Sequence, residues 1–122
     1  MGEKRQYLYV VGKTKERVNA LLDSGANTSY IDVKLANKLK IPLYRQEKVE
    51  MGNGEVVYGH RVVFEVEIEN KIKPIRAIAM NIPEKLVIGH DFMQDNDVII
   101  DYVNEKIRFS KRIPNKNRRF KL

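Results

Sequence analysis

Leu21-Leu22-Asp23-Ser24-Gly25-Ala26 is the most informative part of this 122-residue chain. Asp23 closes an apolar run and opens a tight turn, which is an unusual place for an acid that serves only solubility. An ordinary turn would leave the carboxyl in water. Acid-base chemistry would instead hold it in a partly dry position, since burial and neighbouring groups tune proton affinity. Asp23 is therefore the candidate catalytic residue.

The composition is that of one small globular domain. Hydrophobic residues make up 43% of the chain, and no apolar run approaches the roughly 20 residues that a membrane helix needs. We expect no membrane partner, and no signal peptide is apparent. The chain has no Cys, and its two His, His60 and His90, stand apart. We therefore expect no disulfide, no metal and no cofactor, and a reducing compartment is compatible with this composition.

The net charge of +7 is concentrated near the C-terminal end. Residues 111–122 hold six Lys and Arg and no acid, so they carry six of the seven net charges. With Pro114 and little apolar periodicity, this segment is typical of a basic flexible tail or linker. The alternative is a weak contact with RNA, because clustered Lys and Arg bind phosphates without sequence selectivity.

Residues 1–110 have mostly the pattern of β-strands, because short runs of β-branched and aromatic residues are separated by Gly, Asn and Pro. The predicted strands span 7–11, 17–22, 28–31, 72–82, 86–88, 98–102 and 106–109, and a long hairpin spans 43–69. Two short helices are predicted, over 33–40 with Asp32 as its cap and over 91–96. The sum is an all-β domain, either a small closed barrel or a sandwich.

The hairpin over 43–69 has the clearest signals. Met51-Gly52-Asn53-Gly54-Glu55 contains Asn-Gly, a strong turn signal, between two β-prone flanks. In the returning strand the apolar residues Val62, Phe64, Val66 and Ile68 alternate with mostly charged ones. This alternation predicts a strand that covers a core on one side.

The order of three features points to a known family. Leu21-Leu22-Asp23-Ser24-Gly25-Ala26 is followed by the Asn-Gly hairpin, and then by Leu86-Val87-Ile88-Gly89-His90-Asp91. Over residues 7–109 the chain resembles the retropepsin family, the aspartic proteases of retroviruses, plant pararetroviruses and LTR retrotransposons. The helix over 33–40 and the segment Gly89-His90-Asp91-Phe92-Met93 look most similar to pararetroviral proteases of the caulimovirus or badnavirus type and to those of LTR retrotransposons.

This resemblance implies a retropepsin-like small closed barrel over 1–110, with 111–122 as the basic tail or a polyprotein linker. It implies an aspartic endopeptidase that cleaves a viral or retroelement polyprotein at mildly acidic pH, in the host-cell cytoplasm or the virus particle. The chain has one Asp-Ser-Gly, whereas the chemistry needs two carboxyls. The enzyme would therefore be a homodimer in which Asp23 of each chain meets its copy.

The same resemblance gives roles to the neighbours of Asp23. The Ser24 hydroxyl would bond across the dimer and brace the loop, while Gly25 would allow the turn. Ala26 and Ile31 are candidates for the floor and wall of the cleft, with plain core positions as the alternative.

The tip of the long hairpin would be a flap. Met51, Gly52, Asn53 and Gly54 would close over an extended peptide and bond to its backbone. Met51 and Val56 would offer apolar contacts, and the flanking subsites would prefer apolar side chains. The alternative is a plain surface hairpin.

Two positions depart from the retroviral pattern. Many retroviral members carry an acid two residues after the motif Gly and an Arg directly after the late Gly, and these form a salt bridge that supports the dimer. Asn27 and His90 occupy those positions here. A contact between them is weaker than an Arg-carboxylate pair, so we expect a weak dimer. For His90 the alternative is a plain turn residue.

Two other functions remain open. A noncatalytic retropepsin-like module would dimerise or bind a peptide without cleaving it, although such a module has no need of Asp23. A nucleic-acid-binding barrel would stack bases on exposed aromatic residues beside basic ones. We expect no such stripe on the body, so residues 111–122 alone support that function.

Overall fold

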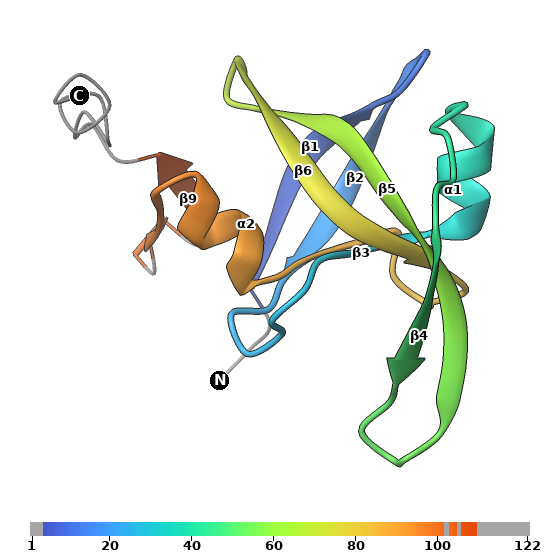
Figure 1. Ribbon diagram of the computed structural model, residues 1–122. Coiled ribbons are helices and arrows are strands. Elements are labelled where there is room, and N and C mark those ends of the chain that lie inside the picture. The colour runs from blue at the N-terminus through green and yellow to red at the C-terminus, as the bar shows by residue number, and fades with distance from the viewer. Residues whose placement is uncertain (1–3, 102, 105, 110–122) are drawn as a thin grey trace, which may run out of the picture.

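The computed structural model describes residues 4–101, 103–104 and 106–109, and a closed barrel makes up most of them (Figure 1). The ring runs β1, β2, β7, β3, β6, β5, and β5 pairs back with β1 to close it. The bounds in chain order are β1 Lys4–Val11, β2 Lys15–Leu22, β3 Tyr30–Asp32, β5 Val56–Ile68, β6 Lys71–Met80 and β7 Leu86–Ile88. Of the two predicted architectures, the closed barrel is confirmed and the sandwich is wrong.

The order of strands brings the two apolar-Gly motifs together. β7 lies between β2 and β3 and runs parallel to β2, with Leu21 opposite Val87 and Leu22 opposite Ile88. Parallel neighbours end at the same edge of a sheet. Asp23, directly after β2, and Gly89, directly after β7, therefore leave the barrel side by side.

The long hairpin is built as predicted. β4 (Gln46–Glu50) lies outside the ring and pairs with the first residues of β5, so that the hairpin extends beyond the barrel (Figure 1). The rest of β5 alternates as expected, since its apolar members are buried and the residues between them face outward; the buried ones are Val62, Phe64, Val66 and Ile68. One strand thus supplies both the barrel wall and one arm of the hairpin.

The first helix is shorter than predicted. α1 (Val33–Lys38) ends two residues before residue 40, where Lys40 adopts a positive φ of 60°. Leu35, Ala36 and Leu39 are buried in the core, so the helical spacing was interpreted correctly. Asp32 does occupy the N-cap position, but its side chain makes no capping hydrogen bond, so the predicted capping is wrong.

A second, two-stranded sheet follows the barrel. α2 (His90–Asp95) leads into β8 (Val98–Asp101), which pairs with β9 (Lys106–Phe109). Its turn is held by Asp101, which accepts hydrogen bonds from the side chain and backbone of Asn104 and from the Val103 N–H, and these bonds lower the pKa of Asp101.

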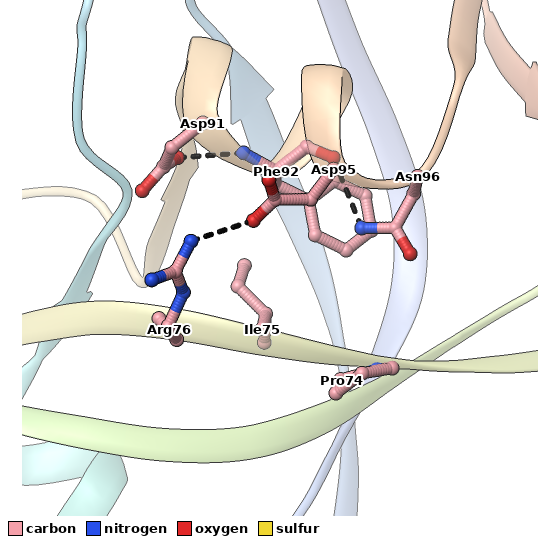
Figure 2. A pocket seen from close by; sticks show the side chains of 7 residues that line it. All are labelled: Pro74, Ile75, Arg76, Asp91, Phe92, Asp95 and Asn96. Atoms are coloured by element: carbon pink, nitrogen blue, oxygen red, sulfur yellow. Dashed lines mark hydrogen bonds and ion pairs between the residues drawn. The ribbon is translucent and has the colours of Figure 1, made fainter. Parts of the chain in front are cut away.

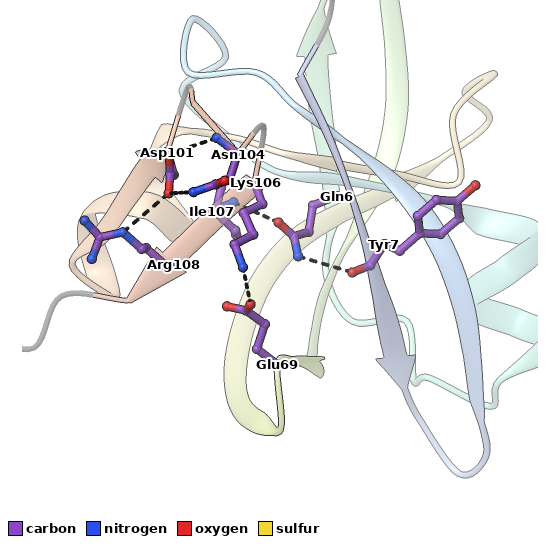
Figure 3. A network of polar contacts seen from close by, with 8 residues as sticks. All are labelled: Gln6, Tyr7, Glu69, Asp101, Asn104, Lys106, Ile107 and Arg108. Carbon is purple, nitrogen blue, oxygen red and sulfur yellow. Dashed lines mark hydrogen bonds and ion pairs between the residues drawn. The ribbon is translucent and has the colours of Figure 1, made fainter.

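The small sheet is attached to the barrel through β1 (Figure 3). The Ile107 N–H donates to the Gln6 side-chain oxygen at 2.8 Å, and the Lys106 ammonium pairs with Glu69 at 2.9 Å. Ile107 itself is fully buried. The hairpin predicted at the C-terminal side of the domain is thereby confirmed.

Residues 111–122 lie outside the described residues, so the basic tail, its possible RNA contact and the domain boundary at residue 110 stay predictions. Among the described helices, none is long and apolar enough to cross a membrane.

Candidate active site

Backbone hydrogen bonds fix the loop that carries Asp23. The Asp23 N–H donates to the Ile88 carbonyl at 2.9 Å, which ties the start of the loop to the end of β7. The Ala26 N–H then donates to the Asp23 carbonyl at 3.1 Å and closes a turn. Within this turn the Gly25 N–H donates to Oδ1 of Asp23 at 3.1 Å and orients the carboxyl.

The Asp23 carboxyl is exposed in the single chain. Within the described residues, the Gly25 N–H is the one group that hydrogen-bonds to it, and Ser24 and Gly25 are exposed as well. The predicted partly dry position is therefore wrong for the chain on its own, because β2 ends at the rim of the barrel and no described side chain covers the turn.

A buried network braces the far end of the same loop. Ser29 is fully buried, and its hydroxyl donates to Oδ1 of Asp91 at 2.8 Å while accepting from the Gly89 N–H at 2.9 Å. The Ser29 N–H also faces Oδ2 of Asp91 at 3.4 Å. Buried polar groups gain most when every partner is present, so this network holds the loop against the start of α2.

Sequence reasoning missed Ser29 and Asp91 as site residues. The available signal was Asp91 itself, an acid directly after the Gly89-His90 step at the end of a buried strand. Its partner lies 62 residues earlier, and no periodic pattern connects positions so far apart.

Gly89 is required where the loop and β7 meet. A Cβ at this position would lie 2.5 Å from the Thr28 carbonyl oxygen and 2.9 Å from that of Ala26. The His90 N–H donates to the same Ala26 oxygen at 2.7 Å. The two backbones therefore touch directly, which only a glycine permits.

The two predicted dimer supports are both exposed, and no hydrogen bond joins the Asn27 side chain to His90 in the described chain. His90 instead lines a surface hollow of about 410 Å³ together with Ser24 and residues of α2 and β8. Ser24 and His90 thus share one hollow beside the loop, and Asn27 is exposed four residues after Asp23. Their predicted roles between chains stay predictions.

Of the two candidates for the cleft lining, Ile31 is a core residue with no exposed surface. Ala26 is half-buried beside the loop. The alternative of a plain core position therefore applies to Ile31.

The tip of the long hairpin has the turn that its sequence predicts. The Met51 N–H donates to the Glu55 carbonyl at 2.7 Å, and the Gly54 N–H donates to the Met51 carbonyl at 2.9 Å. Gly54 has a φ of +85°, which favours glycine, and the Asn53 side chain accepts from the Glu55 N–H at 2.9 Å. The predicted tip residues from 51 to 54 and Val56 are all exposed.

Between this hairpin and the barrel lies a pocket of about 310 Å³, here called the hairpin pocket. Its lining comes from β3, β4, the hairpin tip, the end of β6, the loop before β7 and β7 itself: Tyr30, Val49, Glu50, Met51, Gly52, Met80, Ile82, Pro83, Glu84 and Val87. Most of these side chains are apolar, as expected for a site that takes side chains of an extended peptide.

A two-pronged ion pair fixes one wall of the hairpin pocket. Arg5 on β1 donates from its two terminal nitrogens to both oxygens of Glu84, at 2.9 and 2.8 Å. These bonds lower the pKa of Glu84. The loop before β7 is thereby tied to β1.

A second hollow of about 220 Å³ lies between β6 and α2 (Figure 2). Arg76 projects from β6 and pairs with Asp95 at 2.8 Å, and this pairing raises the pKa of Arg76. Asp91 also lines this hollow. The same residue therefore lines the hollow and, through Ser29, braces the Asp23 loop. No cluster of metal-ligating side chains occurs among the described residues.

The outer face of the opening hairpin carries the basic and aromatic residues that were not expected on the body. Arg17 lies over the Tyr7 ring at 4.1 Å, and Lys15 lies over the Tyr9 ring at 4.7 Å. The expectation that the body lacks a group of basic and aromatic residues is therefore wrong. However, Lys15 also pairs with Glu67, and the two cations cover ring faces on which a nucleic-acid base would stack. This face is therefore a poor platform for base stacking.

The geometry agrees with comparisons to known proteins. The family model described as aspartyl protease matches residues 9–92, which include the Asp23 loop, the long hairpin and Gly89. The chain belongs to the aspartyl protease family. A comparison with curated protein sequences found no match.

Two solved structures of similar proteins share this fold. The retroviral protease-like domain of Ddi1 from Leishmania major has a TM-score of 0.66 at 17% identity, covering 89% of this chain and 90% of that chain. The EIAV protease, in complex with the inhibitor HBY-793, has a TM-score of 0.56 at 26% identity, covering 75% of this chain and 88% of that chain. The predicted retropepsin-like fold of this aspartyl protease is therefore confirmed.

Proposed function

We propose that this aspartyl protease is an endopeptidase active as a homodimer, in which each chain contributes Asp23 as one of two catalytic carboxyls. The observation that carries the proposal is the exposed Asp23 carboxyl on a loop held by Ile88, Ser29 and Asp91. A rigidly held but uncovered acid suits a group that is completed by a second chain.

The chemistry explains why two carboxyls are needed. One ionised carboxyl takes a proton from the attacking water, and one protonated carboxyl donates to the oxygen of the scissile carbonyl. Two such groups a few ångströms apart share one proton and titrate as a unit, as is general for aspartic proteases. The chain has one Asp-Ser-Gly motif, so the second carboxyl would be Asp23 of a second copy.

The surroundings of Asp23 fit an isologous contact. Ser24, Asn27 and His90 are exposed on the side where a second loop would approach, and Ser24 and His90 share one hollow. Ser24 would donate or accept across the interface, while the neutral amide of Asn27 would contact His90. Since no charge-assisted pair is available from these two, the dimer should be weak.

The substrate would be an extended peptide held beneath the long hairpin. The exposed tip, Met51 to Gly54, would bond to the peptide backbone, and the hairpin pocket would take one of its side chains. Residues at the tip would then move over the bound peptide as a flap.

The natural substrate would be a viral or retroelement polyprotein, processed in the host-cell cytoplasm or the virus particle. Similarity to the EIAV protease supports a viral source. The likeness to the Ddi1 domain from Leishmania major concerns the fold alone. A pararetroviral or LTR-retrotransposon origin is tested by whether the chain cuts the junctions of such a polyprotein expressed with it.

The activity itself is tested by incubating the chain with a peptide library from pH 4 to 8 and identifying cuts by mass spectrometry. We expect cleavage by the wild type, best in mildly acid solution, and none by Asp23→Asn. This variant keeps an acceptor for the Gly25 N–H, so it should fold normally. Binding without cleavage by the wild type, or equal cleavage by both proteins, would contradict the proposal and favour a noncatalytic module.

A further inference from the structure

The hairpin pocket has one feature that the expected apolar subsite does not explain. We propose that this pocket selects a long basic side chain, Lys or Arg, of the peptide substrate, and that Glu50 sets this preference. The inference rests on the proposed endopeptidase function and adds a substrate class to it.

The walls of the hairpin pocket suit the stem of such a side chain. A space of about 310 Å³ is lined by Val49 and Met51 from the hairpin, by Met80 and Val87 from the barrel strands and by Ile82 from the loop before β7. Lys and Arg bury their methylene stems against apolar surface while the charged head stays near water. The pocket is open to solvent at the hairpin, where Met51 is 38% exposed, so the head would not be stripped of water.

The polar groups of the lining call for a positive charge. Three lining residues have polar side chains, namely Tyr30, Glu50 and Glu84. Both oxygens of Glu84 are engaged by Arg5. The Glu50 carboxylate has no hydrogen-bond or ion-pair partner within the described residues, and neither does the Tyr30 hydroxyl. The Glu50 carboxylate therefore remains available to a ligand.

Nearby bases do not cancel this charge. Arg5 is committed to Glu84, and Lys85, in the same loop as Glu84, is held by Glu16 at 3.0 Å. Lys48 precedes Glu50 on β4 but does not line the pocket. The ionised groups that remain at the pocket thus leave one net negative charge, which attracts a cationic side chain and disfavours an acidic one.

Glu50 also lies where substrate contact would be made. It is the last residue of β4, opposite Val56, and directly precedes Met51 at the hairpin tip. A hairpin that closes over a peptide would carry this carboxylate toward the bound side chain. Apolar walls with one charged group at the mouth would set specificity without contributing to the bond-breaking step.

The test uses peptides that are identical except at one position, which carries Lys, norleucine or Glu, with each position around the cut examined in turn. Norleucine has the stem of Lys without its charge. We expect the wild type to prefer Lys over norleucine about three- to fivefold in kcat/KM at one position, as a partly exposed ion pair provides. Glu50→Gln should lose this preference, because its kcat/KM for the Lys peptide should fall to that for the norleucine peptide.

Glu65→Gln is the matched control, because it removes the same charge from the outer face of β5, away from the pocket. Peptide binding to Asp23→Asn, with and without Glu50→Gln, is measured in parallel by fluorescence anisotropy. Cleavage without a Lys preference, or with one that survives Glu50→Gln, would overturn the inference alone. Lys-selective, Glu50-dependent binding without any cleavage would overturn the endopeptidase function alone, and neither binding nor cleavage would overturn both.

Discussion

The Ser29 hydroxyl links three parts of the site, since it accepts from the Gly89 N–H and donates to Asp91. Ser29→Ala should lower the free energy of unfolding by about 1–3 kcal/mol, because it leaves a buried N–H without its partner. Urea unfolding of dilute protein measures this change. The matched control is Ser24→Ala, which removes an exposed hydroxyl and should change the stability by less than about 0.5 kcal/mol. Equal effects of the two variants would contradict the bracing role of Ser29.

Individual residues differed in how far their sequence context predicted them. Asp23 was recognisable because an acid between an apolar run and Gly25 is rare without a purpose, yet its exposure was predicted wrongly. Burial depends on what lies opposite a residue, and the sequence neighbours of Asp23 do not contain that information. Ser29 and Asp91 were missed for the same reason, since the role of each depends on a hydrogen bond to a partner far away in the sequence.

The loop before β7 depends on the ion pair between Arg5 and Glu84, and this dependence should vary with pH. Because the pairing lowers the pKa of Glu84 below its ordinary value of 4.5, its contribution is complete above that value and is lost as the pH falls through the lowered one. At pH 7, Glu84→Gln should cost up to about 1 kcal/mol, a small effect because both side chains are partly exposed.

Urea unfolding of the wild type and Glu84→Gln between pH 7 and pH 3 tests whether the Arg5–Glu84 ion pair stabilises the loop before β7. The difference in stability should shrink toward zero in acid. A difference that grows as the pH falls would show that the pair does not stabilise the folded chain through the ionised carboxyl.

Elements with strong local signals were predicted well. The Asn53-Gly54 turn and the alternation along β5 are local properties, so the hairpin was found with nearly correct bounds. Helix α1 ends earlier than predicted because Lys40 takes a left-handed conformation. A Lys gives no sequence signal for such a conformation, unlike Gly or Asn. Local patterns also missed the parallel pairing of β2 with β7, which joins segments far apart in the chain.

For the whole molecule, the choice between barrel and sandwich rested on a few long-range pairs. Closure occurs where Tyr9, Val10 and Val11 meet Glu67, Val66 and Glu65. The same strands fit either architecture by pattern alone, so the sequence left both open. Resemblance to a family, rather than periodicity, favoured the barrel.

Assembly of two molecules should be weak, since the neutral Asn27 stands where an acid would form a salt bridge. Sedimentation at micromolar concentration and neutral pH should detect both monomer and dimer. Introducing an acid and a base together, as Asn27→Asp with His90→Arg, should tighten the dimer about tenfold, while either change alone should not. A wild type that sediments solely as a dimer would contradict this expectation.

Sharing of the active site between two chains is tested most directly by mixing. Wild-type protein at fixed concentration is titrated with Asp23→Asn, and the cleavage rate of one peptide is followed. If each active site needs Asp23 from both chains, the rate should fall as mixed dimers form, and the wild-type rate per molecule should rise with its own concentration. A rate that is proportional to wild-type concentration and unaffected by excess Asp23→Asn would contradict a shared site.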